Sequence, residues 1–341
     1  MGIKVLVVDD SLSFRRYMRM GLSSLPEVET VTLTESGEEA LEVLTLSGGR
    51  FDLVTMDVEM PGMGGMEAIR RIRSRWEIPV LVISSLWSPG EVALTFKAFE
   101  AGAFDVLAKP APRTDPNTFA RRIISTAMPV INRTQPMGGI KPRELKVPSP
   151  PAKKPYQIKV IAVGASTGGP KATLELLSAL PAPLPVPLLL VQHMSTGFDE
   201  GYVEWIKTAS GRKIQLARDG EVPSSDTVIV APAGRHMELN KGSIRLTDGP
   251  QSHGVKPSVS VLFKSLLNEL GGSWCGILLS GMGSDGAQEL KAARETGALT
   301  LVQDPESSVV WGMPGEAWRI GGADMMLAPL RMGEFIRNVI H

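Results

Sequence analysis

The first 125 residues alternate between short apolar runs and stretches in which apolar positions recur at helical spacing. Residues 3–8, apart from Lys4, and residues 80–83 are apolar and rich in β-branched side chains, as in strands covered on both faces. Such alternation of strands and amphipathic helices predicts a parallel sheet with helices on both sides. The predicted strands are 3–8, 28–34, 53–56, 80–83 and 104–108, and the predicted helices lie near 12–25, 38–46, 66–75, 91–101 and 119–127.

Closely spaced prolines interrupt this pattern after residue 125, and the alternation resumes at residue 158. The prolines are Pro129, Pro136, Pro142, Pro148, Pro150, Pro151 and Pro155, a composition typical of an extended tether. The later predicted strands are 158–163, 186–192, 227–231, 243–246, 275–280 and 299–303, and a helix is predicted at 172–180. We therefore expect two doubly wound α/β domains, 1–125 and 158–341, joined by a proline-rich linker at 126–157.

The composition excludes several classes of protein. Lys+Arg and Asp+Glu both number 36, so the basic excess that nucleic-acid-binding proteins usually show is missing. The single cysteine excludes a disulfide framework. No apolar run reaches the roughly 18 residues that a membrane span needs, and the first residues do not have the pattern of a signal peptide. We expect a cytoplasmic protein that neither binds nucleic acid nor inserts into a membrane.

Polar and charged residues follow the predicted strands of the first domain. They are Asp9, Asp10, Asp57, Ser84 and Lys109. The carboxyl ends of parallel strands form one edge of a sheet, and open α/β sheets bind their ligands there. Converging carboxylates raise one another's pKa unless a cation offsets their charge, and Mg²⁺ prefers oxygen ligands and phosphates. Together with the Lys109 ammonium and the Ser84 hydroxyl, the carboxylates predict a site where a phosphoryl group is transferred to an aspartate.

Residues 1–125 resemble the response-regulator receiver domain, which has a flavodoxin-like fold. The resemblance implies that Asp57 is the phosphorylated residue. It also implies that Mg²⁺ is held by Asp9, Asp10 and Asp57, with help from the carbonyl of Glu59. The phosphodonor would then be the histidine kinase of a chemotaxis system.

The same resemblance implies roles for the last strand of this domain. Lys109 and Ser84 would contact the phosphoryl group and act in the receiver switch, and a cis peptide bond would precede Pro110. One position departs from the family pattern, because Val106 stands where an aromatic residue usually changes rotamer on activation. This departure concerns the side-chain part of the switch and not the phosphorylation.

A serine in a glycine-rich turn begins the second domain. The segment 164–169 reads Gly-Ala-Ser-Thr-Gly-Gly and lies between a predicted strand and a predicted helix. It satisfies the G-x-S-x-G pattern, in which glycines allow a sharp turn that exposes the hydroxyl of Ser166. The amides that follow lie at a helix N-terminus, which favours a developing oxyanion. Taken alone, such a turn is more often a helix cap or a phosphate cradle than a catalytic site.

Two further residues make catalysis the better interpretation. His193 ends the strand 186–192, and Asp285 follows the strand 275–280, so both reach the sheet edge where Ser166 lies. In a hydrolytic triad, His193 would take the proton of Ser166, and Asp285 would orient and stabilise the imidazolium. The chain order Ser, His, Asp differs from that of the α/β-hydrolases, so that fold is not implied.

The segment around Asp285 also supports a different interpretation. Gly281, Gly283 and Gly286 spell G-x-G-x-x-G between a strand and a helix, and Asp304 follows at about the distance that a dinucleotide fingerprint expects. This pattern would make the protein an oxidoreductase. Against it, the carboxylate of Asp285 would lie close to a pyrophosphate, where a negative charge is unfavourable.

Residues 158–341 resemble the catalytic domain of the chemotaxis protein-glutamate methylesterase family (the CheB family), which has a Rossmann-like sheet. The segments that carry the resemblance are 164–170 (GASTGGP), 192–194 (QHM), 231–239 (APAGRHMEL), 256–263 (KPSVSVLF), 280–287 (SGMGSDGA) and 312–317 (GMPGEA). The resemblance implies that Ser166, His193 and Asp285 are the catalytic triad. It places Thr167 and Met282 close to the oxyanion.

The resemblance also implies an activity. Ser166 would attack a glutamyl methyl ester on a chemoreceptor and release methanol, and the enzyme would deamidate receptor glutamines, which gives sensory adaptation. Phosphorylation of Asp57 would relieve a block by the receiver domain. The catalytic domain would need no cofactor, and we expect a monomer. A non-catalytic, phosphorylation-dependent scaffold is an alternative from another class.

Three positions of the second domain depart from the family pattern. Lys256 stands where the family often has Arg, Ser260 stands where it often has Asp, and Gly315 stands where a basic residue is common. These positions lie outside the predicted triad. We therefore expect the chemistry to be unaffected and the contacts to the substrate to differ.

Overall fold

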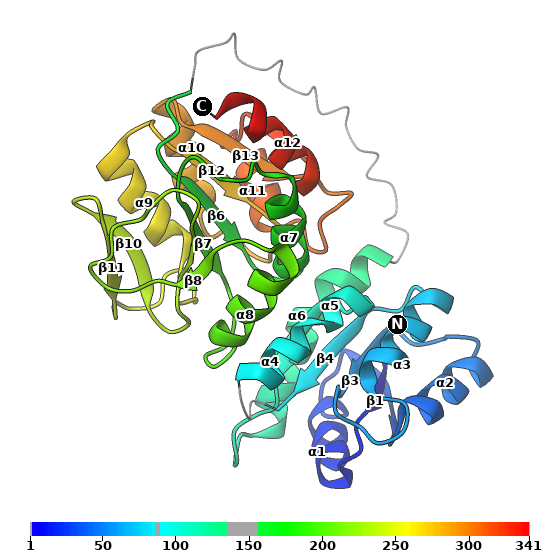
Figure 1. Cartoon of the computed structure of the whole chain (residues 1–341). Helices are drawn as coiled ribbons and strands as arrows, with labels where there is room; N and C mark the ends of the chain where they lie inside the picture. The colour runs from blue at the N-terminus through cyan, green and yellow to red at the C-terminus, as the bar shows by residue number, and fades with distance from the viewer. Residues whose placement is uncertain (1, 86–88, 135–155, 341) are drawn as a thin grey trace. The chain divides into compact units, whose positions relative to one another are not determined.

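The computed structural model describes residues 2–85, 89–134 and 156–340, and the chain divides into two compact units (Figure 1). The units are Met1–Lys141 and Pro142–His341. Each has its own parallel sheet and its own apolar core, so each can position a site without the other. Most of the predicted linker, residues 135–155, lies outside the described residues.

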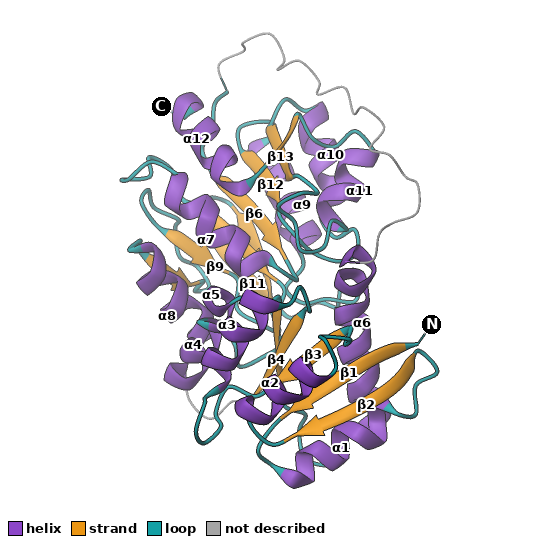
Figure 2. Cartoon of the chain, turned by 90° about the vertical axis from the view of Figure 1, so that its right-hand side faces the viewer, coloured by secondary structure: helices purple, strands orange, loops and turns teal. Residues whose placement is uncertain are grey.

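The first unit is a five-stranded parallel sheet covered by helices on both faces. Its strands are β1 (Ile3–Val8), β2 (Val28–Thr34), β3 (Leu53–Met56), β4 (Val80–Ser84) and β5 (Asp105–Ala108). Its helices are α1 (Leu12–Leu22), α2 (Gly37–Leu46), α3 (Gly65–Arg75), α4 (Pro89–Phe96), α5 (Ala98–Ala101) and α6 (Pro116–Thr134). The strand order is β2-β1-β3-β4-β5. Helices α1 and α6 pack against each other, as do α2 and α3 (Figure 2). The predicted parallel sheet is confirmed.

Two predicted helices of this unit differ from the observed ones. The predicted helix 91–101 is divided into α4 and α5 at Lys97. The ψ of Lys97 is −14°, whereas a regular α-helix has a ψ of about −42°. Helix α6 continues to Thr134, past the predicted end at residue 127 and past Pro129. Val130 and Ile131 remain buried, and their burial offsets the cost of a proline inside a helix.

The second unit is a seven-stranded parallel sheet with an added hairpin. Its strands are β6 (Ile161–Ala165), β7 (Leu188–Gln192), β8 (Ile214–Leu216), β9 (Val228–Val230), β10 (His236–Asn240), β11 (Ser243–Thr247), β12 (Cys275–Leu278), β13 (Leu299–Gln303) and β14 (Met325–Leu327). Its helices are α7 (Gly169–Ala179), α8 (Asp199–Ser210), α9 (Val259–Leu270), α10 (Ala287–Glu295), α11 (Met313–Arg319) and α12 (Pro329–Val339). The order of the main sheet is β14-β13-β12-β6-β7-β9-β8. The prediction of a second α/β unit is confirmed.

The hairpin is the main difference from the predicted elements of this unit. The predicted strand 243–246 is β11, but it pairs antiparallel with β10 and not with the main sheet. The two-residue loop between them is Lys241-Gly242, and both residues have positive φ, as a type I′ turn requires. The sequence analysis did not predict β8, β10 or β14, which have only three to five residues each.

The strand orders determine where ligands can bind. In the first unit the connections from β1 and β3 run to opposite sides of the sheet, and in the second unit those from β6 and β12 do the same. A crevice opens at the carboxyl ends of two such strands, and open α/β sheets bind their ligands there. Asp9 and Asp57 follow β1 and β3, whereas Ser166 and Asp285 follow β6 and β12. The predicted site residues therefore lie at the two switch points.

Candidate functional site

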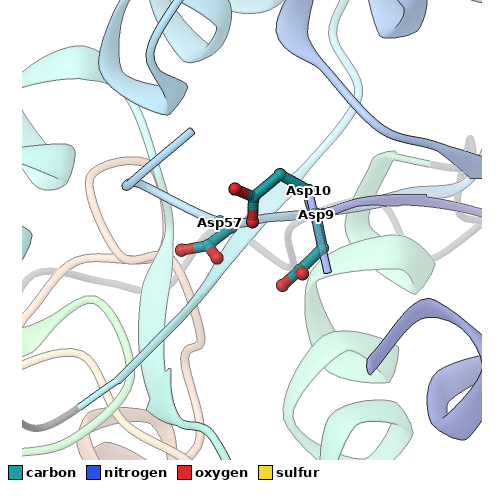
Figure 3. Close-up of side chains that lie close together, drawn as sticks. All are labelled: Asp9, Asp10 and Asp57. Atoms are coloured by element: carbon teal, nitrogen blue, oxygen red, sulfur yellow. The ribbon is translucent and has the colours of Figure 1, made fainter. Parts of the chain in front are cut away.

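Three carboxylates come together at the switch point of the first unit. Figure 3 shows Asp9, Asp10 and Asp57 side by side, and one oxygen of each lies within 4.8 Å of the others. Asp9 and Asp57 are 1% and 5% exposed, whereas Asp10 is exposed. Burial raises the pKa of Asp9 to about 6, even though Lys109 lowers it. A second cation at this cluster would offset the remaining charge.

Lys109 joins the two buried carboxylates. Its Nζ lies 2.7 Å from Asp9 Oδ2 and 2.5 Å from Asp57 Oδ2, and it also lies 4.8 Å from the centre of the Phe14 ring. Burial lowers the pKa of Lys109, but the hydrogen bonds and charges of the two aspartates outweigh it and raise the pKa overall. The ammonium therefore remains charged next to the aspartate that is predicted to carry the phosphoryl group.

The other predicted residues of the first site lie around this cluster. The Ser84 hydroxyl is buried and shares a hydrogen bond of 3.1 Å with Thr95, and the Glu59 N–H donates to Asp57 Oδ1 at 3.3 Å. Val106 is half-buried and packs against the apolar core of the unit.

The peptide bond before Pro110 is trans, so the cis bond implied by the receiver resemblance is wrong for this structure. The trans form is the lower-energy state of a bond to proline. Lys109 reaches both carboxylates with this bond in the trans form.

Three carboxylate groups at this spacing suit a hard divalent cation. Mg²⁺ takes oxygen ligands and keeps open positions for water and phosphate oxygens, and a cluster of carboxylates at a sheet edge supplies that chemistry. The residues present therefore fit Mg²⁺. They are Asp9, Asp10 and Asp57, and the part of the Glu59 carbonyl stays a prediction.

In the second unit, Ser166 occupies a tight turn between β6 and α7. Its N–H donates to the Ser280 carbonyl at 2.9 Å, and its carbonyl accepts from the Gly169 N–H at 2.7 Å. Gly168 has a φ of 76°, a conformation that glycine adopts without strain, and α7 starts at the next residue. The turn leaves the Ser166 side chain partly exposed at the carboxyl edge of the sheet.

His193 and Asp285 form a hydrogen bond at the same edge. His193 Nε2 lies 2.9 Å from Asp285 Oδ2. Burial alone would raise the pKa of Asp285, but the hydrogen bond and charge of His193, the Ser260 N–H and the Ser258 hydroxyl outweigh it. They lower the pKa well below its usual range. Because an ionised carboxylate only accepts hydrogen bonds, Nε2 carries a proton in this pair, and Nδ1 is the nitrogen that is available for proton exchange with another group.

Ser166 lies next to this pair. The backbone N–H of His193 donates to the Ala165 carbonyl at 2.9 Å. The backbones of Ser166, which follows β6, and of His193, which follows β7, are therefore neighbours. Gly281 also lies against Ser166, because an ideal Cβ on Gly281 would be 2.7 Å from Ser166 Cβ. Within the described part of the chain, no hydrogen bond joins the Ser166 hydroxyl to His193. The structure therefore brings the three residues to one edge of the sheet and joins two of them, His193 and Asp285, directly.

Thr167 and Met282, the residues predicted to lie close to the oxyanion, have backbone N–H groups without an acceptor among the described residues. Met282 is 50% exposed, which is unusual for a large apolar side chain. Free donors of this kind, at a helix N-terminus and a strand end, are suited to a developing negative charge.

The sequence analysis missed the residues that hold Asp285. The Ser258 hydroxyl donates to Oδ1 at 2.7 Å, the Val259 N–H donates to Oδ2 at 2.7 Å and the Ser260 N–H donates to Oδ1 at 2.9 Å. Buried His236 in turn accepts the Ser258 N–H at 3.2 Å. Only the presence of these residues in the segments that resemble the family signalled their importance.

Ser260, a position outside the predicted triad, is bonded directly to one of its members, Asp285. Besides its N–H bond to Asp285, its hydroxyl accepts from the Gly286 N–H at 2.8 Å and donates to Glu289 at 2.7 Å. Ser260, the second residue of α9, therefore bonds both Asp285 and the residue that follows it, Gly286. Lys256 Nζ bonds the Gly249 carbonyl at 3.2 Å, away from Asp285.

The hydrogen bonds of Asp285 and Asp304 do not support the dinucleotide interpretation. Asp285, at the centre of the glycine loop, is occupied by His193 and three backbone or hydroxyl donors. The Asp304 carboxylate accepts the N–H and the hydroxyl of Ser307 in its own turn. Neither carboxylate is arranged for a cofactor.

Across the described residues, no helix is both long and apolar enough to cross a membrane.

In fold and in site, the second unit is of the serine-hydrolase class, and the first is of the receiver type. Residues 161–336 match the CheB methylesterase family model, and residues 5–118 match the response regulator receiver domain model. The chain therefore belongs to the CheB methylesterase family, with a receiver domain before the methylesterase domain.

Individual relatives extend the match to nearly the whole chain. A protein-glutamate methylesterase/protein-glutamine glutaminase of Nitrosospira multiformis is 40% identical, over 99% of this chain and 97% of the relative. Another of that description from Methanospirillum hungatei is 38% identical over 99% of this chain and 98% of the relative. The crystal structure of the Thermotoga maritima CheB methylesterase catalytic domain is 27% identical with a TM-score of 0.52, and it covers 54% of this chain and 99% of that one.

Proposed function

We propose that this chain is a phosphorylation-activated serine hydrolase that removes methyl groups from glutamyl methyl esters of chemoreceptors and deamidates receptor glutamines. The hydrogen bond of His193 to Asp285 beside Ser166 carries the proposal, because it supplies an oriented base next to a hydroxyl at a switch point. The names of the full-length relatives support the choice of substrate. The reaction belongs to sensory adaptation in chemotaxis.

The reaction starts with a proton transfer. His193 Nδ1 accepts the proton of the Ser166 hydroxyl while Oγ attacks the γ-carbonyl carbon of the ester. The N–H groups of Thr167 and Met282 donate to the resulting oxyanion. The imidazolium, stabilised by Asp285, returns the proton to the leaving oxygen, and methanol departs from the acyl-enzyme. Water then attacks the acyl-enzyme with the same base and frees the glutamate. With glutamine the first product is ammonia.

The receiver unit supplies the regulation in this proposal. Asp57 accepts a phosphoryl group from a histidine kinase, and Lys109 and Ser84 contact its oxygens. Asp9, Asp10, Asp57 and the Glu59 carbonyl would hold Mg²⁺, which would supply positive charge next to the phosphoryl oxygens. In the unphosphorylated state the receiver inhibits the esterase. Such a gate has an effect only as large as the difference in docking free energy between the two receiver states.

The division of the chain follows the same proposal. The receiver domain begins at residue 1, the proline-rich segment before residue 158 is the linker, and 158–341 is the catalytic domain. The protein acts as a cytoplasmic monomer. Its receptor substrates and its kinase are the partners that this activity requires.

Methanol release from methylated receptor membranes tests this function. The assay compares wild type, Ser166→Ala and Asp57→Asn, each with and without Mg²⁺ and a small acyl phosphate as phosphodonor. We expect the phosphodonor to raise the wild-type rate, Ser166→Ala to release no methanol above the membrane blank, and Asp57→Asn to keep an unstimulated basal rate. Ser178→Ala, at an exposed serine of helix α7, which follows the Ser166 turn, is the matched control.

Each alternative predicts a different outcome of this assay. Full activity of Ser166→Ala would overturn the esterase mechanism and leave the scaffold interpretation. Stimulation that persists in Asp57→Asn would overturn the gate and spare the esterase. Tight binding of a nicotinamide cofactor, lost in Asp304→Asn, would support the oxidoreductase instead.

A further inference from the structure

The side-chain amide of Gln192 links the two strand ends that carry Ser166 and His193. Gln192 is the last residue of β7 and is 2% exposed. Its Nε2 donates to the Ser166 carbonyl at 2.9 Å and to the His193 carbonyl at 3.1 Å. Both hydrogens of the amide are therefore used on the backbone of these two residues.

The first of these bonds determines where a neighbouring N–H points. The Ser166 carbonyl and the Thr167 N–H belong to one peptide group, which is trans. In a planar trans peptide the C=O and the N–H point in opposite directions. Gln192 and the Gly169 N–H hold the carbonyl from one side, at 2.9 Å and 2.7 Å. The Thr167 N–H must therefore point away from Gln192, where no described residue accepts its hydrogen.

The other proposed oxyanion donor has the same construction. The Met282 N–H shares its peptide group with the Gly281 carbonyl, which accepts the N–H groups of Gly312 at 3.0 Å and of Met313 at 2.9 Å. Each proposed donor thus belongs to a peptide group whose carbonyl oxygen accepts two hydrogen bonds. For Met282 both anchors are backbone groups, whereas for Thr167 one anchor is a side chain. A substitution of Gln192 can therefore release one donor without touching the other.

The orientation of the Gln192 amide has an unfavourable consequence that supports this role. Its Oε1 is buried and has no hydrogen-bond partner among the described residues. An ideal Cβ on Gly169 would lie 2.3 Å from this oxygen, so that side of the amide is closely packed. A buried acceptor without a partner is destabilising. Turning the amide over would be worse, because Oε1 would then face two carbonyl oxygens.

We infer that Gln192 is a positioning residue that directs the Thr167 N–H toward the oxyanion and holds the backbone of His193 beside Ser166. Its hydrogen bond also polarises the Ser166–Thr167 peptide, which makes the Thr167 N–H a stronger donor. The inference rests on the esterase activity proposed above. It adds to that mechanism a residue that never contacts the substrate.

The substitution Gln192→Met tests this role, because methionine has a similar length and no donor. Gln303→Met is the matched control: Gln303 is 1% exposed at the end of β13, and its amide bonds the Ser280 N–H and the Ser307 hydroxyl. Both variants lose a buried amide, but only the first loses an anchor of Thr167. Methanol release from methylated receptor membranes is measured in the full chain, per mole of folded protein, with thermal unfolding of each variant recorded.

We expect Gln192→Met to lower kcat about ten- to hundredfold at nearly unchanged KM, since loss of one oxyanion donor costs about 10²–10³ in kcat. For Gln303→Met we expect a similar decrease in Tm and a kcat within about threefold of wild type. If Gln192→Met does not fold, Gln192→Glu, which keeps the length and loses both donors, replaces it with the same expected fall in kcat.

A decrease for Gln192→Met no larger than for Gln303→Met, or one confined to KM, would overturn the inference. A wild type no more active than Ser166→Ala would instead overturn the proposed function, so the two failures are distinguishable.

Discussion

Asp285 shows how strongly one buried charge depends on its neighbours. The carboxylate is 2% exposed, and it is ionised because His193 and the donors of residues 258–260 surround it. A charge in this position is unfavourable without such donors. The donors therefore serve both the stability of the second unit and the orientation of the imidazole.

The substitution Asp285→Asn separates these two effects. An amide has nearly the same shape, but it lacks the negative charge that keeps the Nε2 proton of His193 in place. Its NH₂ group would also face groups that are themselves hydrogen-bond donors. We expect the rate of methanol release to fall about 10³–10⁴-fold, as for the acid of the serine-protease triad. We expect the free energy of unfolding at pH 7 to fall by about 1–3 kcal/mol, the cost of a disrupted buried hydrogen-bond group.

The effect on stability depends on pH in a defined direction. The folded protein lowers the pKa of Asp285 below its unfolded value of roughly 3.9, so the carboxylate contributes stability above that pH. This contribution is lost as pH falls toward the lowered pKa. The difference in unfolding free energy between wild type and Asp285→Asn should therefore shrink between about pH 5 and pH 2. Urea unfolding at several pH values measures it, with Asp304→Asn as the control. A pH-independent difference would contradict the assignment.

At the scale of secondary-structure elements, the turn between β6 and α7 limits what residue 168 can be. Gly168 has a φ of 76°, and an ideal Cβ on it would lie 2.4 Å from Val309 Cβ and 2.8 Å from Ser280 Oγ. Gly211, which ends α8, has a φ of 67° and no heavy atom within 4 Å of its ideal Cβ. The two glycines share a backbone conformation and differ in their surroundings.

Alanine substitutions at these two glycines therefore have different expected costs. Gly211→Ala should destabilise by about 1 kcal/mol, the cost of the left-handed conformation alone. Gly168→Ala adds a collision, so we expect about 2–4 kcal/mol and a large loss of methanol release, because Ser166 must shift. Thermal unfolding and the esterase assay measure both. Equal destabilisation by the two variants would show that the space around Gly168 is not restrictive.

The elements that carry the site were predictable, and much of their support was not. An apolar run followed by a polar residue signals a buried parallel strand with a polar edge, and His193 and Asp57 were singled out in this way, whereas Ser166 was singled out by its G-x-S-x-G turn. The residues that bond Asp285, such as Ser258, come from a different part of the fold, so no local pattern shows them. Hairpin β10–β11 was missed as a pair, although the Lys241-Gly242 turn marks it.

The features that could not be predicted depend on side-chain contacts between segments that are distant in the sequence. Gln192 looks like an ordinary strand end, and its importance follows only from two carbonyls that the fold places beside its amide. The extension of α6 past Pro129 depends likewise on the burial of Val130 and Ile131, which propensity alone does not reveal.

At the scale of the whole molecule, the residues of the proposed phosphorylation site lie in one unit and those of the proposed esterase site lie in the other, so the proposed regulation is a free-energy coupling between the two units. If phosphorylation of Asp57 shifts the chain toward a state with an open active site, a receptor segment should bind that state more tightly. Linkage then requires the reverse effect, of equal size, on the receiver. A tenfold change in affinity corresponds to about 1.4 kcal/mol of coupling.

Ser166→Ala allows this coupling to be measured, because it binds receptor without turnover. Beryllofluoride with Mg²⁺ stands in for the phosphoryl group at Asp57. We expect it to raise the affinity of Ser166→Ala for a receptor fragment by some factor, and saturating receptor fragment to raise the affinity for beryllofluoride by the same factor. Titration calorimetry measures both, and Ser166→Ala combined with Asp57→Asn should show neither. Two unequal factors would mean that the sites do not share one two-state equilibrium, and a factor of one in both directions would mean that the receiver does not gate receptor binding.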